Sequence, residues 1–428
     1  MKITTIKWRR FVALVSGVLF LQNASYATDV YYPPVTESLN RLTSTNQFIR
    51  DRGMRDLVDM GKAAAPAYDV LITIALSSNN LPRTRSSALF ALKNIDATRA
   101  ATYFIQELTN SSATIREYAV NALMTIKDPR ATIPLFNRLN DENNRVRDRA
   151  GIALQFYPNK TLEKLLLESL SKPTDKAREY APWLLGRMHS KAALAPLHNL
   201  LTDPSPTFRL SVIAALRDIK SKTSVTPLIQ IAEHDKDNNI RVQALQCLGE
   251  LGDTKAAPTI LAALNDEHPE VRASAANAAG KLGIKDAKPR LREILKQGVS
   301  KDIIAAMGAL CQMKDTNSIP IIVDRINSEN YNIFTQYMML GLVELEAESE
   351  IQKLKKHSNP QIQALAEKAL KKLKKRKSQV TSPFSEEEFD LGVKLKVTPV
   401  EINKSNSKPG PGDVIFVTSD TQTPTNKP

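Results

Sequence analysis

The chain has 428 residues, with 59 Lys and Arg against 45 Asp and Glu, a formal net charge of +14 and an aromatic content of only 6%. Its positive charge is local: without residues 1–27 the net charge is +10, and Ile351–Lys377 alone carries ten Lys or Arg against one Glu. The rest of the chain is close to neutral, which argues against a protein that wraps nucleic acid along its length.

Residues 1–27 have the pattern of an export signal. Four basic residues precede an 11-residue apolar segment, Phe11–Leu21, and Ser25-Tyr26-Ala27 offers small residues at the two positions that a signal peptidase reads. The apolar segment is shorter than the ~20 residues that span a membrane. We therefore expect an exported protein, periplasmic or secreted, with an uncleaved signal anchor as the alternative.

After the signal, residues 28–45 contain two consecutive prolines and are predicted to form an extended lead-in. A capping helix is expected over Asn46–Met60. An arginine then recurs every 31 or 32 residues, at Arg85, Arg116, Arg147, Arg178, Arg209, Arg241 and Arg272. Self-similarity at such a period is the signature of stacked helical repeats. We therefore predict an all-α superhelix of about ten two-helix repeats, a solenoid over residues 46–377 with terminal capping helices.

One repeat can be followed from Lys255 to Gly283. A first helix begins near Pro258, where a missing N–H is harmless. Residues 265–269 form a turn, and a second helix with small residues on its buried face follows. Gly283 ends that helix as a C-terminal cap. The small residues predict that neighbouring layers pack closely.

An Asn or Asp stands six residues before most of these arginines, at the turn between the two helices. An acceptor at each turn and a guanidinium at the start of each second helix predict a ladder of hydrogen bonds between layers. This structural ladder comprises Asp141, Arg147, Asp203, Arg209, Asp235, Arg241, Asp266 and Arg272. A catalytic or phosphate-binding role for the arginines is the alternative.

The repeat, with Pro and Leu in the first helix, Asp at the turn and Arg, Ala and Gly in the second helix, resembles the HEAT-like repeat of the phycobilisome-lyase type. The resemblance covers residues 63–375 and is clearest in Ala257–Gly283. It implies a HEAT-type α-solenoid, but adaptors, lyases, hydroxylases and chaperone-like factors share such repeats. The related deoxyhypusine hydroxylases carry His-Glu pairs after the arginine, where this chain has pairs such as Ala273-Ser274. We therefore expect no metal site of that kind.

Positions two, five and nine residues after each arginine are predicted to form an exposed stripe on the concave side. Most are small or polar, but the repeat around Arg178 is aromatic and basic. Aromatic residues together with arginine are typical of interface hot spots. The predicted partner-binding residues are Tyr118, Arg149, Tyr180, Trp183 and Arg187. Pro182 is expected to kink this helix, and the alternative is that Trp183 fills the space that the kink opens.

Towards the C-terminus, the final helix of Pro360–Lys374 combines an apolar stripe with a lysine face, as a terminal cap requires. The predicted basic patch comprises Lys371, Lys372, Lys374, Lys375, Arg376 and Lys377. Residues 378–428 are rich in Ser, Thr, Pro, Asn and Lys and are predicted to be largely disordered. Two short β-prone segments interrupt this tail, and strand pairing with a partner is their alternative role. Cys247 and Cys311 lie two repeats apart and are predicted to be buried free thiols.

The sequence contains no His-Glu-x-x-His motif, no glycine-rich phosphate loop and no Gly-x-Ser-x-Gly elbow. We therefore predict no catalytic residues, metal or cofactor. The expected function is that of a monomeric exported scaffold or adaptor that binds a protein or peptide along its concave face, with no nucleic-acid partner. One alternative is an envelope factor that binds anionic lipid or a cell-wall polymer through the basic C-terminal helix. Another is an enzyme, or a lyase-like or chaperone factor of the same repeat family.

Overall fold

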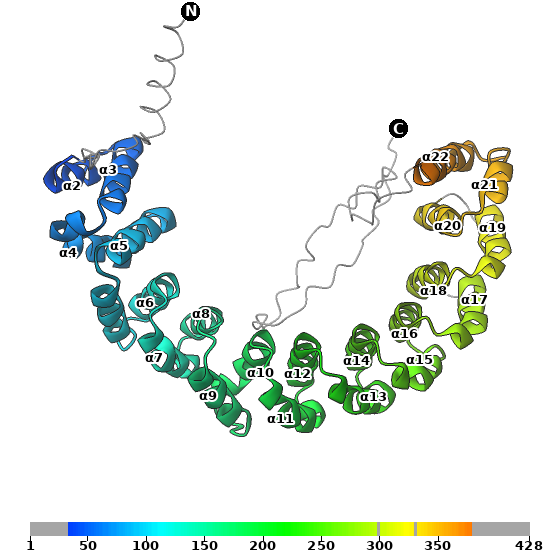
Figure 1. Ribbon diagram of the computed structural model, residues 1–428, viewed down its shortest axis with the longest axis horizontal. Coiled ribbons are helices and arrows are strands. Elements are labelled where there is room, and N and C mark those ends of the chain that lie inside the picture. Colours follow the sequence, from blue (N-terminus) through cyan, green and yellow to red (C-terminus); the bar gives the residue numbers. More distant parts are fainter. Residues whose placement is uncertain (1–32, 298–299, 329–331, 379–428) are drawn as a thin grey trace, which may run out of the picture. The chain divides into compact units, whose positions relative to one another are not determined.

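The computed structural model describes residues 33–297, 300–328 and 332–378. Within these ranges every element is an α-helix or a short 3-10 helix, and no strand occurs (Figure 1). The predicted all-α repeat fold is therefore confirmed. The chain divides into two units at Ala100, which are described separately below. The expected signal (residues 1–27) and the tail beyond residue 378 lie outside the described residues.

The first unit contains α2 (Val35–Leu42), α3 (Gln47–Asp59), α4 (Tyr68–Leu76) and the first part of α5 (Pro82–Glu107). Asn46 caps α3 by accepting a hydrogen bond from the backbone N–H of Phe48. Helices α2 and α3 pack so closely at Gly53 that an added Cβ would lie 2.7 Å from the carbonyl oxygen of Ser38. The backbone of α5 is non-helical at Asp96, so this element consists of two consecutive helices.

Helix α2 contradicts the extended conformation expected for the end of the lead-in. Pro34 occupies the cap position immediately before the helix, where its lack of an N–H breaks no intrahelical bond. Glu37 lies in the first turn and Arg41 in the last, so both charges favour the helix dipole. Arg41 also pairs with Glu37 and with Asp56 of α3. The two prolines therefore precede a helix and do not extend the segment that follows them.

The second unit alternates two rows of helices (Figure 1). The outer row contains α7 (Thr132–Asn137), α9 (Lys160–Leu170), α11 (Leu194–Asn199), α13 (Val225–His234), α15 (Ala257–Ala263), α17 (Lys288–Gln297), α19 (Ile319–Ser328) and α21 (Glu348–Leu354). The inner row contains α6 (Ala113–Ile126), α8 (Asn144–Leu154), α10 (Ala177–Arg187), α12 (Pro206–Ile219), α14 (Asn238–Leu251), α16 (Pro269–Leu282), α18 (Ser300–Gln312), α20 (Ile333–Glu344) and α22 (Pro360–Ser378). Each repeat thus contributes one helix to each row, and the recurrent arginines stand near the start of the inner helices.

Small residues on the inner helices let consecutive layers approach closely. A Cβ added to Gly186 of α10 would lie 2.9 Å from the Cα of Ala215 in α12. The same contact recurs between Gly280 of α16 and Ala309 of α18, again at 2.9 Å. Real side chains almost never approach backbone so closely, so these positions accept only glycine without a shift. The close packing predicted from the small residues is present.

Both cysteines are free, as predicted. Cys247 is buried, and Cys311 is half-buried with its Sγ 3.7 Å from the carbonyl oxygen of Gly341. Burial raises the pKa of each thiol to about 12. Both side chains therefore remain protonated at neutral pH and belong to the packing of the repeats.

Candidate functional site

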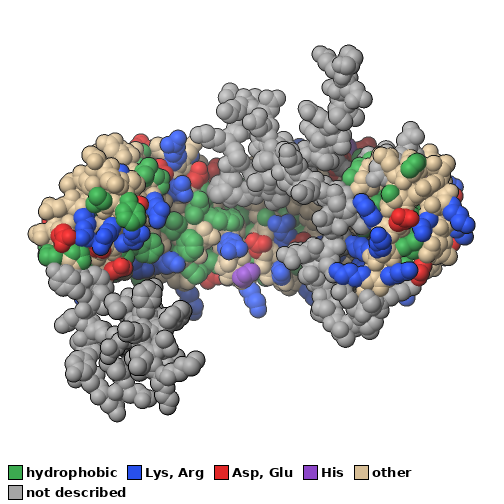
Figure 2. Space-filling view, turned by 90° about the horizontal axis from the view of Figure 1, so that it is seen from above, with side chains coloured by type: hydrophobic (Ala, Val, Ile, Leu, Met, Phe, Trp, Pro, Cys, Tyr) green, Lys and Arg blue, Asp and Glu red, His purple; other side chains and the backbone are tan. Residues whose placement is uncertain are grey.

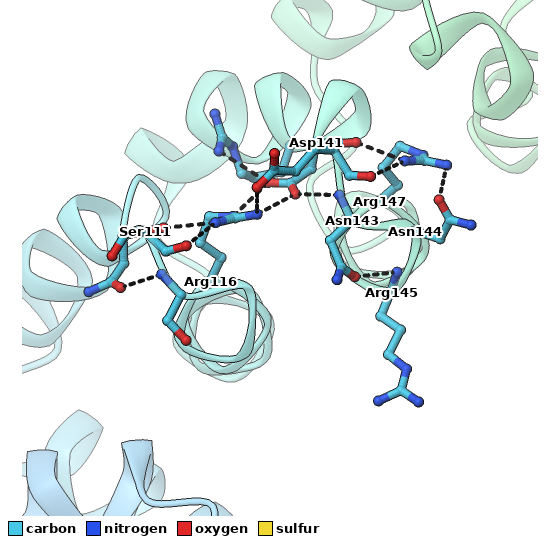
Figure 3. A network of polar contacts seen from close by, with 11 residues as sticks. Ser111, Arg116, Asp141, Asn143, Asn144, Arg145 and Arg147 are labelled. Carbon is cyan, nitrogen blue, oxygen red and sulfur yellow. Dashed lines mark hydrogen bonds and ion pairs between the residues drawn. The ribbon is translucent and has the colours of Figure 1, made fainter.

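The recurrent arginines stand near the start of the inner helices, and their side chains reach into the turns between the two helices of a repeat, as Figure 3 shows for Arg116. Its Nη1 donates to the carbonyl oxygens of Asn110 and Ser111, at 2.9 and 3.0 Å, in the turn of its own repeat. Its Nε and Nη2 donate to the two carboxylate oxygens of Asp141, at 2.9 and 2.8 Å, in the turn of the next repeat. Each guanidinium thus joins two consecutive turns.

This bridge recurs along the second unit. Four further arginines bond to a carboxylate in the following repeat: Arg178 to Asp203, Arg209 to Asp235, Arg241 to Asp266 and Arg272 to Asp302. Arg209, Arg241 and Arg272 also donate to the carbonyl oxygen of the residue six positions upstream, at 2.8 to 2.9 Å. The acid six residues upstream therefore gives its backbone oxygen to its own arginine and its carboxylate to the arginine of the preceding repeat.

The turn itself orients each of these carboxylates. Asp141 and Asp203 each accept a bond from the backbone N–H two residues later, at 2.9 Å. Burial is the largest single influence on both acids and disfavours their charged form. The arginine hydrogen bond, the backbone N–H bond and the nearby positive charges together outweigh it and leave the pKa of each carboxyl below its ordinary value. Both acids are therefore held ionised within a largely buried contact.

The ladder is interrupted at Arg147. The position 25 residues further on is Lys172, not an acid, and Arg147 bonds instead to the carbonyl oxygens of Asp141 and Glu142 and to the side chain of Asn144. Sequence spacing also missed Asp302, which lies 30 residues after Arg272 at the start of α18. The layers of α8 and α10 are thus joined without this ion pair.

Tyr180 occupies part of that junction, and the expectation that it is exposed is wrong. Its side chain is 3% exposed, and its hydroxyl donates to Asp148 of α8 at 2.8 Å. A Cβ on Gly151 would lie 2.9 Å from the Tyr180 ring, so the ring fills the space that this glycine leaves. Burial, together with the bond to Asp148, raises the pKa of Tyr180. Tyr180 is a packing residue between layers.

The other four predicted partner-binding residues keep exposed surface. Trp183 is half-buried, and its ring lies 3.6 Å from the Cβ position of Gly151. Arg187 is exposed, and Tyr118 is half-buried. The side chain of Arg149 is 47% exposed, with its Nε 3.6 Å from Glu117 of α6. Helix α10 is a single element from Ala177 to Arg187 although Pro182 lies inside it.

Sequence reasoning overlooked Phe156, which lies two residues after the end of α8. Its side chain is 44% exposed, and the Lys127 ammonium lies 4.9 Å from its ring centroid. Phe156 stands nine residues after Arg147, and Arg187 takes the same position after Arg178 in the next repeat. The predicted exposed stripe therefore already included Phe156. Residues nine positions after the arginine also approach each other between other neighbouring repeats. Glu250 and Lys281, which follow Arg241 and Arg272 by nine residues, lie 3.8 Å apart.

Arg149 and Ile152 lie three residues apart on one side of α8, and Phe156 follows two residues after the end of this helix. Trp183 and Arg187 share one side of α10. Ile152 is half-buried. We name these five residues the α8–α10 surface. Figure 2 views the molecule from the side of the inner row, where hydrophobic side chains lie beside Lys and Arg. The surface combines two accessible aromatic rings with two exposed arginines.

The predicted basic patch lies at the end of α22. Lys371, Lys374 and Lys375 are exposed, whereas Lys372 and Arg376 are half-buried. The Nη2 of Arg376 lies 2.9 Å from Glu344 of α20, so this residue anchors the helix to the preceding inner helix. The side chain of Lys377 lies outside the described residues.

Comparison with protein families supplies the identity of the repeats. The model described as HEAT repeats matches residues 68–155, 163–241 and 225–310, which together make up more than half of the chain. The chain belongs to the HEAT-repeat family. No curated protein sequence matches the chain significantly.

Solved HEAT-repeat structures resemble the fold. Kap95p in complex with RanGDP matches with a TM-score of 0.54 and 15% identity, over 88% of this chain and 58% of Kap95p. Kap121p bound to Nup53p matches with a TM-score of 0.52 and 11% identity, over 86% of this chain and 47% of Kap121p. This chain therefore spans about half the length of these karyopherins, and at such identities the likeness concerns the fold alone.

Among the described residues, no group of three or more His, Cys, Asp or Glu side chains could hold a metal ion. A pocket of about 450 Å³ lies between α19 and α21, lined by apolar side chains that include Val323 and Leu354 and by polar ones that include Lys353 and His357. None of the described helices is both long and apolar enough to cross a membrane.

Proposed function

We propose that this protein is a non-catalytic scaffold that binds a protein or peptide through the inner row of its HEAT repeats, with the α8–α10 surface as the principal contact. The observation that carries the proposal is the pair of accessible rings, Phe156 and Trp183, beside Arg149 and Arg187. In the three repeats that follow, positions two and five of the stripe are small or amide side chains such as Ala214 and Asn277. The α8–α10 surface thus differs in chemistry from the repeats that follow it.

The packing beneath this surface suits an interface anchor. Trp183 rests against Gly151, next to Tyr180, which Asp148 fixes by a hydrogen bond. A ring held on an ordered base loses little conformational freedom when a partner covers it, and this favours binding. Phe156 and the exposed arginines would contact apolar side chains and carboxylates of the partner.

The fold and the N-terminal sequence support two further parts of the proposal. Kap121p has been solved with Nup53p bound and Kap95p with Nup1, so proteins of this fold can hold protein partners. The basic and apolar pattern of residues 1–27 favours an exported scaffold that acts in the periplasm or outside the cell. The repeat sequence favours the phycobilisome-lyase subtype of HEAT repeat.

Site-specific photocrosslinking tests the proposed surface. A photoreactive amino acid is placed at position 183 or 156, and in a control at Ile133, a 51% exposed residue of the outer helix α7. The proposal requires a discrete crosslinked partner from positions 183 and 156 in the envelope fraction, absent from position 133. Identical products from all three positions would refute a favoured inner surface.

The basic end of α22 supports a second candidate function, association with anionic lipid or a cell-wall polymer. Lys371, Lys374 and Lys375 are exposed near the C-terminal end of the described array. Such a patch binds anionic surfaces through long-range attraction that salt screens. Sedimentation with anionic vesicles at low and high salt separates this function from protein binding, which relies on buried aromatic contacts.

A further inference from the structure

Helix α22 ends in an exposed cationic stripe. Lys368, Lys371 and Lys374 are exposed at intervals of three residues, while the opposite face packs Ile362 and neighbouring apolar residues into the array. The one acid of this helix, Glu367, lies 3.8 Å from Lys355 in the preceding loop. Figure 2 shows Lys and Arg side chains gathered at the end of the array that contains α19 to α22. The stripe is therefore a concentrated positive surface at the last layer.

The sequence directly after α22 contains the complementary charge. No acid occurs between Glu367 and Glu386, and then Glu386, Glu387, Glu388 and Asp390 fall within five residues. We call Glu386–Asp390 the acidic segment. The remaining acids of the sequence, Glu401, Asp413 and Asp420, are widely separated. The acidic segment is thus the only dense negative cluster in residues 379–428 of the sequence.

The connecting chain is long enough for the acidic segment to return to the stripe. Glu386 follows Ser378 by eight residues, which span at most ~26–29 Å when extended. Lys368 precedes Ser378 by ten residues of helix, a distance of ~15 Å along the axis. A turn of the chain after α22 can therefore place Glu386 beside any lysine of the stripe.

The spacing of the acids in the acidic segment is similar to the spacing of the exposed lysines on α22. In an extended segment alternate residues share one side, so Glu386, Glu388 and Asp390 would follow one another at ~6.6 Å. Exposed lysines three residues apart on α22 follow one another at ~4.5 Å along the helix axis, and flexible side chains bridge the difference. Three carboxylates can therefore meet three ammonium groups in a single register.

We propose that the acidic segment docks in cis along the cationic stripe of α22, antiparallel to the helix. Exposed ion pairs are individually weak and are screened by salt. The covalent connection to α22 offsets this weakness, because it holds the acidic segment at a high effective concentration near the stripe.

Zero-length carbodiimide crosslinking of the full chain, followed by peptide mapping, tests this contact. At low salt we expect intrachain links from Glu386, Glu387 or Glu388 to Lys368, Lys371 or Lys374, reduced at least tenfold in ~1 M salt, where charges are screened within ~3 Å. The variant E401Q/D413N/D420N removes three other negative charges from the same tail and should retain links from the acidic segment. Yields to Lys368, Lys371 and Lys374 that are unchanged by salt would overturn the proposal.

A charge exchange supplies the decisive control. K368E/K371E/K374E alters only exposed positions of α22, so the fold should persist while links from Glu386–Glu388 to the remaining lysines of α22 are lost. Combining it with E386K/E387K/E388K should restore links, now from the new lysines of the tail to the new glutamates of α22. Failure of this rescue, or links found only between two chains, would show that the segment does not dock in cis.

Discussion

Arg116 and Asp141 form a bidentate ion pair between consecutive repeats, with side chains only 6% and 1% exposed. Both partners are also bonded to turn backbone, so neither charge lacks a second contact. A buried pair of this kind contributes little net stability relative to apolar packing, but it is costly to break. Its consequence for a solenoid is a fixed register between neighbouring turns.

Arg116→Ala should therefore destabilise the fold much more than Arg147→Ala. The first change leaves the buried carboxylate of Asp141 without its main partner, for which we expect a loss of about 3–5 kcal/mol. Arg147 bonds to two carbonyl oxygens and an amide and has no carboxylate in the next repeat, so its loss should be about 1–2 kcal/mol. Urea unfolding of the two variants measures the difference, and equal losses would contradict the structural role of the ion pair.

The same ladder makes stability depend on pH. The pKa values of Asp141 and Asp203 are lowered in the folded protein, so the unfolded chain binds more protons in acid. The contribution of these two acids to the free energy of unfolding is fully present above the pKa of about 3.9 that Asp has in the unfolded chain. It is lost as the pH falls through the lower pKa values of the folded protein. Urea midpoints measured from pH 7 to pH 3 should fall in the acid range. Asp141→Asn should be less stable at pH 7 and should show a shallower fall.

The glycines of the inner row offer a matched pair of substitutions. Gly280→Ala would place a Cβ 2.9 Å from the Cα of Ala309, so we expect destabilisation of about 1–3 kcal/mol from overpacking. Gly308 lies in the middle of α18, and an added Cβ there meets nothing within 4 Å. Gly308→Ala should therefore stabilise the helix by about 0.5–1 kcal/mol. Thermal melting should show a lower Tm for Gly280→Ala and a higher Tm for Gly308→Ala. A stabilising Gly280→Ala would contradict the close approach of α16 and α18.

The sequence predicted the repeat architecture because its period is set by local spacing, which survives without knowledge of contacts. It also identified the turn acids and arginines, but not their pairing. The carboxylate of Asp266, for instance, bonds to Arg241 of the preceding repeat, while its carbonyl oxygen bonds to Arg272 of its own. Only the stacking of the repeats determines which arginine each oxygen of the acid binds. The helical segment after Pro34 was missed because its stabilising contact, Arg41 with Asp56, lies in another helix.

In the candidate site, the exposure of individual side chains could not be predicted from the sequence. Tyr180 and Trp183 are three residues apart on one helix, so their sequence positions give both the same expected exposure. The difference arises from Gly151 in the preceding layer, where a missing side chain admits the Tyr180 ring and leaves Trp183 at the edge. Exposure in a solenoid thus depends on the residue one repeat away as much as on the helix itself.

Substitutions at Tyr180 and Trp183 should consequently separate stability from binding. Trp183→Ala should weaken binding of the crosslinked partner by at least about 2 kcal/mol, the usual threshold of an interface hot spot, with the fold retained. Tyr180→Phe keeps the ring but removes the bond to Asp148, so it should lower the free energy of unfolding by about 1 kcal/mol and leave binding nearly unchanged. Ile133→Ala on the outer row controls for the loss of an exposed apolar side chain. Calorimetric titration and urea unfolding of the three variants provide the measurements. If Trp183→Ala bound its partner as tightly as Ile133→Ala, the α8–α10 surface would be part of the ordinary packing of the repeats and not the contact through which the scaffold acts.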